Sequence, residues 1–323
     1  MRAIASAAAV ASVAALTVLL PQTANATTAP VVVPGYEFSL LGQHSLPGGT
    51  RYRGTEVGGI TGADYDASTG EFRLLAGDPR SPRFYTGKLN GHCAPKLTAV
   101  TSLRQAENTD PQALRHDSAT GTLLWTDGGG AQDPSVREAD KRGGFVTRLP
   151  TPATLAGASG LTALAPSADG TGVLAALSRP LAADGPAVRF TQYERASATA
   201  RAQYAYLPET GAEVTELLAV ADTRYLVLEQ VEAGSAKLFE VDFALGATNI
   251  ARRPALDGTT YSPVVKREVL AVSALGLRKV DDLQAMTWGP ELGDGARTLV
   301  LVSDNGLDDW RRTQFIAVKV ELG

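Results

Sequence analysis

The segment that predicts the fold is Thr61-Gly-Ala-Asp-Tyr-Asp-Ala-Ser-Thr-Gly-Glu-Phe-Arg-Leu-Leu-Ala-Gly-Asp78. Two short runs rich in apolar residues flank the turn Asp66-Ala-Ser-Thr-Gly70, and Asp, Ser and Gly are residues that form tight turns. One polar residue begins the first run and another ends the second. The segment therefore predicts a β-hairpin with a polar residue at the free end of each strand.

The same pattern recurs four more times along the chain. The recurring hairpins are Gln112–Asp127, Ser159–Ser178, Glu216–Glu229 and Gln284–Asp304. Further strands are expected at Arg83–Leu89, Gly144–Leu149, Val188–Tyr193, Lys237–Phe243 and Gln314–Val320. Hairpins with added outer strands, repeating every roughly 50 to 65 residues, are typical of the four-stranded blades of a β-propeller. We therefore expect an all-β fold.

The number of hairpins predicts five blades. The last blade has only three strands in the C-terminal part of the chain, and the segment Tyr36–Leu46 precedes the first blade. We expect this segment to supply the missing strand, because pairing the N- and C-terminal strands leaves no open edge between the first and last blades. A six-bladed ring stays open as an alternative, with Gly246–Leu277 as the place for the extra blade.

Composition excludes several classes of protein. Hydrophobic residues make up 44% and charged residues 20%, so the chain can bury a core and is not disordered by composition. The formal net charge is −4 and there is no block of Lys and Arg, so we expect no nucleic-acid partner. Cys93 is the only cysteine, which excludes an intrachain disulfide.

The beginning of the chain predicts a targeting segment. Arg2 is followed by an apolar run from Ala3 to Leu20, and Ala24-Asn25-Ala26 has the small-x-small pattern of a signal peptidase site. We expect cleavage after Ala26, with a single domain over residues 27–323 that is secreted, extracellular and monomeric, with no membrane span. The alternative is a retained membrane anchor, but the apolar run is near the lower length limit for spanning.

Several motifs resemble those of one family. They are Glu56-Val-Gly-Gly-Ile-Thr-Gly-Ala-Asp-Tyr-Asp66, Asp78-Pro-Arg-Ser-Pro-Arg-Phe-Tyr85, Leu226-Val-Leu-Glu229 and Leu299-Val-Leu-Val-Ser-Asp-Asn305 with Thr313-Gln-Phe315. In this order they resemble the phytase-like ("esterase-like activity of phytase") family of secreted bacterial proteins, over essentially the whole mature chain. The resemblance implies a β-propeller and hydrolysis of phosphoric or related esters.

Hairpin geometry places two sets of polar residues on one face. The strands of a hairpin are antiparallel, so the start of the first and the end of the second lie together. The starts are Thr61, Gln112, Ser159, Glu216 and Gln284, and the ends are Asp78, Asp127, Ser178, Glu229 and Asp304. If the first strand of each hairpin is innermost, the starts line the channel mouth and the ends form a ring outside them.

The starts depart from the family's pattern of glutamate-glycine pairs. Gln112-Ala113, Ser159-Gly160 and Gln284-Ala285 replace such pairs, so Glu216 is the one ionisable start. Calcium affinity depends on the number of carboxylate ligands. We therefore expect any calcium site to be weak, with Asp78, Asp127, Glu216, Glu229 and Asp304 as its ligands.

Other roles follow from the same face. Glu216, Glu229 and Asp304 are the predicted catalytic residues, and the predicted substrate-binding residues are Arg80, Arg179, Gln112, Gln284 and Asn305. Arginines near the strand ends have the geometry to bind phosphate through two hydrogen bonds. The alternative for each carboxylate is capping of a strand end through nearby backbone N–H groups.

Two functions are consistent with these features. One is a secreted hydrolase, assisted by metal, for small or polyanionic esters of phosphoric or related acids. The other is a propeller without catalysis that binds a ligand or partner on the same face. No G-x-S-x-G nucleophile motif is present, and the three histidines have neither zinc-site nor triad spacing. The sequence thus leaves the substrate open.

Overall fold

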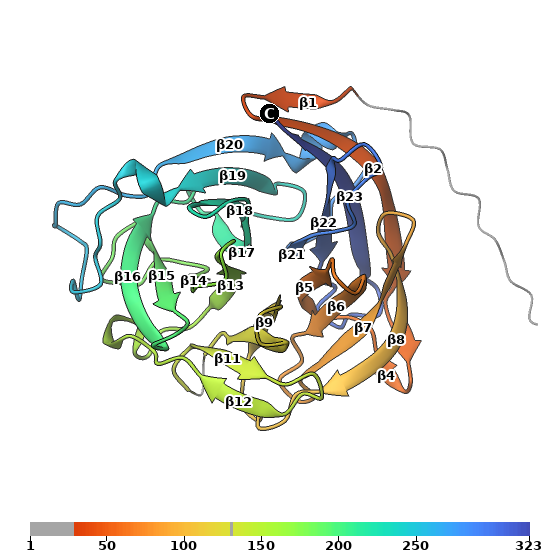
Figure 1. Ribbon diagram of the computed structural model, residues 1–323, viewed down its shortest axis with the longest axis horizontal. Coiled ribbons are helices and arrows are strands. Elements are labelled where there is room, and N and C mark those ends of the chain that lie inside the picture. The colour runs from red at the N-terminus through yellow and green to blue at the C-terminus, as the bar shows by residue number, and fades with distance from the viewer. Residues whose placement is uncertain (1–28, 130–131) are drawn as a thin grey trace, which may run out of the picture.

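The computed structural model describes residues 29–129 and 132–323, and its strands form five antiparallel sheets around a central axis (Figure 1). The predicted all-β, five-bladed propeller is confirmed. The predicted signal peptide lies outside the described residues. Helical structure in the described part is limited to the short 3-10 turns Ala153–Leu155, Phe243–Leu245 and Val272–Leu275. Within that part, no helix has the length and apolar character needed to cross a bilayer.

Blades 1 to 4 each consist of four consecutive strands. Blade 1 contains β5 (Ile60–Asp66), β6 (Glu71–Ala76), β7 (Arg83–Asn90) and β8 (Ala94–Ser102). Blade 2 contains β9 (Pro111–Asp117), β10 (Thr122–Asp127), β11 (Ser135–Ala139) and β12 (Phe145–Arg148). Blade 3 contains β13 (Leu161–Pro166), β14 (Gly172–Leu177), β15 (Val188–Glu194) and β16 (Thr199–Tyr206). Blade 4 contains β17 (Glu213–Ala219), β18 (Arg224–Gln230), β19 (Lys237–Asp242) and β20 (Lys266–Ala271).

Blade 5 joins the two ends of the chain. Its strands are β21 (Leu283–Trp288), β22 (Arg297–Ser303), β23 (Arg312–Leu322), β2 (Tyr36–Pro47) and β1 (Val31–Val33). Strands β2 and β23 are antiparallel along their length, from Tyr36 opposite Leu322 to Pro47 opposite Arg312. The predicted seam is confirmed, and β1 adds a fifth strand outside it. A separate two-stranded ribbon, β3 (Arg51–Tyr52) and β4 (Thr55–Glu56), precedes blade 1.

The segment 246–277 does not form a sixth blade. It contributes β20, which pairs with β19 as the outer strand of blade 4, from Lys266 opposite Val241 to Ala271 opposite Lys237. The part before β20 packs over blade 3, where the N–H of Ile250 donates to the carbonyl of Gln203. The repeat length of roughly 50 to 65 residues therefore includes long loops and does not indicate an additional blade.

The core consists of apolar layers between adjacent blades. The inner strands of each blade are almost completely buried; every residue of β14, for example, is buried. Leu75 and Phe84 of blade 1 pack with Leu123 and Trp125 of blade 2, and comparable clusters join the other neighbouring blades. Burial of these side chains on both faces of a sheet explains the nearly continuous apolar runs in the sequence.

The first strand of each hairpin is innermost. Strands β5, β9, β13, β17 and β21 surround the axis, and each contacts the next one around the ring (Figure 1). Each blade also has a register shift near the start of its inner strand. In blade 4, for example, Val214 lies opposite Glu229 and Glu216 lies opposite Leu228, so Thr215 is an extra, bulged residue. Bulges re-aim side chains, and this one determines which residues face the channel mouth.

Candidate functional site

The bulged residues form a polar ring at the channel mouth. At equivalent positions of the five inner strands the ring contains Thr61, Gln112, Thr162, Thr215 and Gln284. The threonine hydroxyl groups of two blades bridge to the next blade: Thr61 donates to the carbonyl of Pro111 at 2.9 Å, and Thr162 donates to that of Val214 at 2.8 Å. The ring is therefore both a lining and a set of contacts between blades.

The polar ring contains three of the five residues that were predicted as strand starts. Thr61, Gln112 and Gln284 are bulged residues, as above. Ser159 precedes β13 and bridges Gly129, so Thr162 takes its place in blade 3. Glu216 lies one residue beyond the bulge of blade 4. A shift of one residue in a strand turns the side chain to the opposite side, so Glu216 faces away from the ring.

The side chain of Glu216 is fully buried at the centre of the propeller. Its Oε2 atom lies 2.9 Å from a guanidinium nitrogen of Arg115, and its Oε1 atom accepts hydrogen bonds from the N–H groups of Leu164 and Leu217. Removal from water raises the pKa of Glu216 to about 7, although Arg115 opposes the rise. Glu216 is thus enclosed by contacts within the protein, and its predicted catalytic and metal-binding roles stay predictions.

Arg115 completes this central contact. Its guanidinium donates hydrogen bonds to the carbonyl oxygens of Ala63, Leu114 and Leu217 at 2.7 Å and of Met286 at 3.1 Å. These carbonyls belong to blades 1, 2, 4 and 5, and Glu216 reaches blade 3 through Leu164. One ion pair therefore contacts the inner strands of all five blades.

Two of the five predicted ends of the second strands lie directly after their strands. Ser178 and Asp304 come directly after β14 and β22, and their N–H groups donate to the carbonyls of Gly160 and Asp282. The other three predicted ends are placed differently. Asp78 lies one residue beyond the equivalent Gly77, whereas Asp127 and Glu229 are still inside their strands. The ring of carboxylates outside the channel is thus incomplete.

Three of these carboxylates already have close partners. Asp78 accepts a hydrogen bond from the guanidinium of Arg83 at 3.0 Å. Asp127 is buried and accepts from the N–H of Asp110 at 2.9 Å. Glu229 is buried, lies 2.6 Å from Nζ of Lys266, and accepts from the N–H of Glu209 and the hydroxyl of Tyr206. The backbone N–H contacts of Asp127 and Glu229 match the alternative of strand-end capping.

The predicted ligands could bind one calcium ion together only if their side chains lay close to one another. Among the residues that the structure describes, no three Asp, Glu, His or Cys side chains are grouped so that they could hold a metal ion. The five predicted calcium ligands do not fit such a site as a set, and no step below depends on a metal. The weak calcium site stays a prediction.

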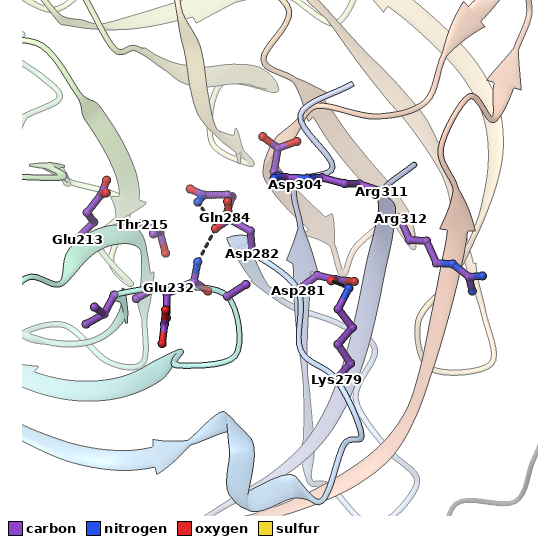
Figure 2. Close-up of a pocket in the computed structure, with 13 residues that line it drawn as sticks. Glu213, Thr215, Glu232, Lys279, Asp281, Asp282, Gln284, Asp304, Arg311 and Arg312 are labelled. Carbon is purple, nitrogen blue, oxygen red and sulfur yellow. Dashed lines mark hydrogen bonds and ion pairs between the residues drawn. The ribbon is translucent and has the colours of Figure 1, made fainter. Parts of the chain in front are cut away.

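A cleft opens between blades 4 and 5 on the face that carries the polar ring. Its volume is about 430 Å³. The residues around it come from the ends of β17, β18, β21 and β22 and from the segment after β22 (Figure 2). They are Glu213, Thr215, Gln230, Val231, Glu232, Ala233, Lys279, Asp281, Asp282, Gln284, Asp304, Arg311 and Arg312. Two predicted site residues, Gln284 and Asp304, therefore share one cleft.

Asp304 is the titratable group most affected by this environment. Burial raises its pKa to about 6, the neighbouring Asp282 carboxylate adds to the rise, and Arg311 opposes it. The carboxylate also accepts hydrogen bonds from the N–H groups of Gly306 at 2.7 Å and of Ile60. Asp304 can therefore give or take a proton near neutral pH while its position is fixed by the backbone.

Asp282 is held by two amide side chains. Gln284 donates to its Oδ1 atom at 2.7 Å, and Gln230 donates to the same oxygen (Figure 2). The side-chain amide oxygen of Gln230 accepts from the N–H of Leu283, which joins blade 4 to blade 5. Since both amides bind one oxygen, the second carboxylate oxygen, Oδ2, can accept a hydrogen bond from water or a ligand.

Cations lie on the blade 5 side of the cleft. Arg311 extends beside Asp304 in Figure 2, whereas Arg312 points away from the carboxylates. Lys279 is paired with Asp281 at 2.5 Å. Arg311 is 64% exposed and lies 3.8 Å from Asp308, a long contact that leaves its guanidinium able to meet an anion.

The remaining predicted substrate-binding residues are not in this cleft. Arg80 is exposed at the end of blade 1. Arg179 reaches the edge of the cleft through its ion pair with Glu213. Gln112 donates to Asp110 at 2.7 Å at the mouth of blade 2. Asn305 is completely buried, and its side-chain oxygen accepts from the N–H groups of Gly59 and Leu307, so it shapes the loop.

Sequence reasoning missed Asp282, Thr215 and Arg115. The signal for Asp282 was present, because Asp110-Pro-Gln112 and Asp282-Leu-Gln284 share an Asp-x-Gln pattern with the same hydrogen bond in each. Thr215 required knowledge of the bulge. Nothing in the sequence distinguishes Arg115 from the exposed arginines.

Comparisons with known proteins were made with the whole chain. Among solved structures, hydrazine synthase of Kuenenia stuttgartiensis has a TM-score of 0.44 with 10% identity, covering 79% of this chain and 81% of that one. A chain of the nidogen/laminin complex has a TM-score of 0.45 with 11% identity, covering 87% of this chain and 99% of that one. A gluconolactonase from Xanthomonas campestris has a TM-score of 0.43 with 10% identity, covering 79% of this chain and 71% of that one. No argument about function rests on these similarities.

No curated protein matches the chain. A family model does match, and it covers residues 55–307, which include all of blades 1 to 4 and the β21–β22 hairpin of blade 5. The matched part contains both Asp282 and Asp304. The chain belongs to the family described as "Phytase-like: Esterase-like activity of phytase".

Proposed function

We propose that this protein is an ester hydrolase and that the cleft between blades 4 and 5 is its active site. The observation that carries this proposal is the arrangement of Asp304, Asp282 and Arg311 around one opening. Two carboxylates whose environments differ can serve as an acid and a base, and a nearby guanidinium can stabilise negative charge. The family match supports a hydrolase in general terms, and phosphoric or related esters are the proposed substrates.

In this mechanism the two carboxylates have different roles. Asp282 accepts a proton through Oδ2 from the water molecule that attacks the ester. Asp304, whose pKa is raised to about 6, donates its proton to the departing alkoxide, so that the products are an acid and an alcohol. Gln230 and Gln284 fix the orientation of Asp282 by their hydrogen bonds. A fixed orientation is what general base catalysis needs.

Arg311 would bind the anionic part of the substrate. Its guanidinium is beside Asp304 and only loosely paired, so it can meet a phosphoryl or other acidic group near the reacting bond. Negative charge that develops on that group in the transition state would be stabilised by the same contact. Lys279 is less suited to this role because Asp281 already neutralises it.

The direct test is hydrolysis of glycerol 2-phosphate and ethyl acetate, whose alkoxide leaving groups need a proton, by the wild-type protein and by Asp304→Asn. Loss of general acid catalysis should reduce kcat by about 10² to 10⁴. A matched control is Asp294→Asn, which makes the same change at the opposite end of the β21–β22 hairpin, where Asp294 pairs with Lys319 at 2.7 Å. Equal rates in wild type and Asp304→Asn would exclude this mechanism.

A second candidate is a binding module without catalysis on the same face. The observation in its favour is that the Asp-x-Gln pair occurs twice, at blades 2 and 5, where it presents amide and carboxylate oxygens. Such groups bind ligands without any need for a proton donor. Absence of turnover in the wild-type protein, together with ligand binding in the cleft, would favour this candidate. For either function we propose export after cleavage at Ala26.

A further inference from the structure

Trp310 is the most exposed large hydrophobic side chain among the described residues. It is 95% accessible, whereas the next most accessible, Val32, is 69%. The other two tryptophans are placed differently: Trp125 is buried, and Trp288 is partly buried and donates its indole N–H to the carbonyl of Ala219. A fully exposed indole leaves a large apolar area in water, and tryptophan is enriched at binding interfaces.

The loop that carries Trp310 is fixed by several hydrogen bonds. The side chain of Asp308 accepts from the N–H of Trp310 at 2.9 Å, and its carbonyl accepts from the N–H of Arg311 at 3.0 Å. At the other end of the loop, Asn305 binds the N–H of Gly59 at 2.7 Å. The backbone at residues 308 and 309 also packs so closely on Gly48 that a Cβ atom there would lie 2.4 Å from the carbonyl of Asp309. The exposed position of Trp310 is therefore a defined part of the fold.

This loop forms one edge of the cleft. Arg311, the residue after Trp310, lines the cleft, and the loop begins at Asp304. Across the opening, Val231 is 53% exposed and also lines the cleft. The cleft thus has apolar surface at Val231, with Trp310 directly before the lining residue Arg311, and hydrogen-bonding groups at its floor.

The floor of the cleft is rich in acceptors. Five carboxylates line it, from Glu213, Glu232, Asp281, Asp282 and Asp304, against three cations. The amide N–H of Gln284 is used by Asp282, which leaves the amide oxygen to accept a bond. An acceptor-rich floor favours a ligand that supplies many donors, and hydroxyl groups are neutral donors that also fit beside an aromatic ring.

We propose that Trp310 is the stacking platform for a sugar ring of the ligand bound in this cleft. One face of the ring presents C–H groups that pack on the indole, while its hydroxyl groups donate to Asp282 and Gln284. This deepens the proposed function, because the sugar would be the alcohol part of the ester and Asp304 would lie near the bond that is cleaved. Binding of the sugar alone does not require hydrolysis and can be measured separately.

The experiment titrates the protein with cellotriose and with maltotriose and follows tryptophan fluorescence and saturation-transfer NMR. Trp310 is the most accessible of the three tryptophans, so a ligand over it should shift the emission and protect it from acrylamide quenching. We expect millimolar binding of at least one trisaccharide. Trp310→Ala should weaken it about two- to twelvefold, because an aromatic contact contributes about 0.5 to 1.5 kcal/mol. Gln284→Leu should also weaken it.

The matched control is Trp288→Phe. Trp288 lies at the opposite end of β21 from the cleft, under the guanidinium of Arg297 at 3.6 Å, so its replacement should leave binding unchanged. No binding of either trisaccharide to the wild type, or equal binding by Trp310→Ala, overturns the proposal. Sugar binding without ester hydrolysis would support this inference and contradict the proposed function. Ester hydrolysis by the wild type, together with sugar binding that Trp310→Ala leaves unchanged, would support the proposed function and contradict this inference.

Discussion

Arg115 of β9 and Glu216 of β17 form an ion pair at 2.9 Å on the axis of the propeller, with both side chains buried. Between them they bind backbone groups of all five inner strands. Ring folds need a device that fixes the blades relative to one another, and here a single pair provides contacts to each blade.

Loss of Arg115 should destabilise the protein strongly. Arg115→Ala leaves the Glu216 carboxylate buried without its cation, and removing one partner of a buried pair costs about 3 to 5 kcal/mol. Urea unfolding should show this loss. The control is Arg179→Ala, whose ion pair with Glu213 is largely exposed and should contribute less than about 1 kcal/mol. A change of similar size in both variants would contradict the central role of Arg115.

Glu216 should make stability fall as the pH rises. Its pKa is about 7 in the folded protein and 4.5 in the unfolded chain, so between these values the folded state holds a proton that the unfolded state has released. The stability is then fully present below pH 4.5 and decreases by at most about 1.4 kcal/mol per pH unit toward pH 7. Glu216→Gln should flatten this slope in unfolding experiments at pH 5, 6 and 7. An unchanged slope would show that Glu216 does not titrate in this window.

Asp304 should control the pH dependence of activity. As a general acid it is active when protonated, so kcat should decrease as the pH rises through about 6. Rates of ester hydrolysis in overlapping buffers would show the decrease, which Asp304→Asn should abolish together with most of the activity. A rate that increases through this range would indicate that Asp304 acts as the base.

The seam of blade 5 should be essential for solubility. Deleting residues 29–47 removes β1 and β2, which exposes the edge of β23 and the apolar side chains beneath it. We expect aggregation by size-exclusion chromatography. Deleting only residues 29–33 removes the outer strand β1 and should leave a soluble protein. A monomeric, folded product of the longer deletion would contradict the role of the seam.

Calcium affinity should respond to charge at the cleft. Wild-type protein is expected to bind Ca²⁺ no more tightly than about 10⁻⁴ to 10⁻³ M, the weak end of the extracellular range. Gln284→Glu adds a third carboxylate beside Asp282 and Asp304 and should tighten binding in calorimetric titration, whereas Gln284→Leu should not. Tight binding by the wild type would show that other residues coordinate the ion.

The candidate site was predicted in part. Asp304 and Gln284 were identified because both lie at strand ends where the antiparallel geometry is simple, and the cleft contains both. Glu216 was assigned to the channel mouth because the bulge at Thr215 is invisible in the sequence. Asp282 was overlooked although its spacing to Gln284 repeats that of Asp110 to Gln112.

The sequence by itself determined the class of fold. Repeated hairpins, with turn residues between apolar runs, specify strands and their order because these signals are local and have a period of two residues. The pairing of Tyr36–Pro47 with the last strand followed from the need to cover an edge.

Only the tertiary structure decided which polar residues meet. The bulges shift each inner strand by one residue, and the closing of the ring brings Arg115 of blade 2 to Glu216 of blade 4. These two residues are far apart in the chain, and burial raises the pKa of Glu216 and of Asp304. Neither the shift of register nor the loss of water around a carboxylate is written in the local sequence, because both depend on how five separate sheets pack around one axis.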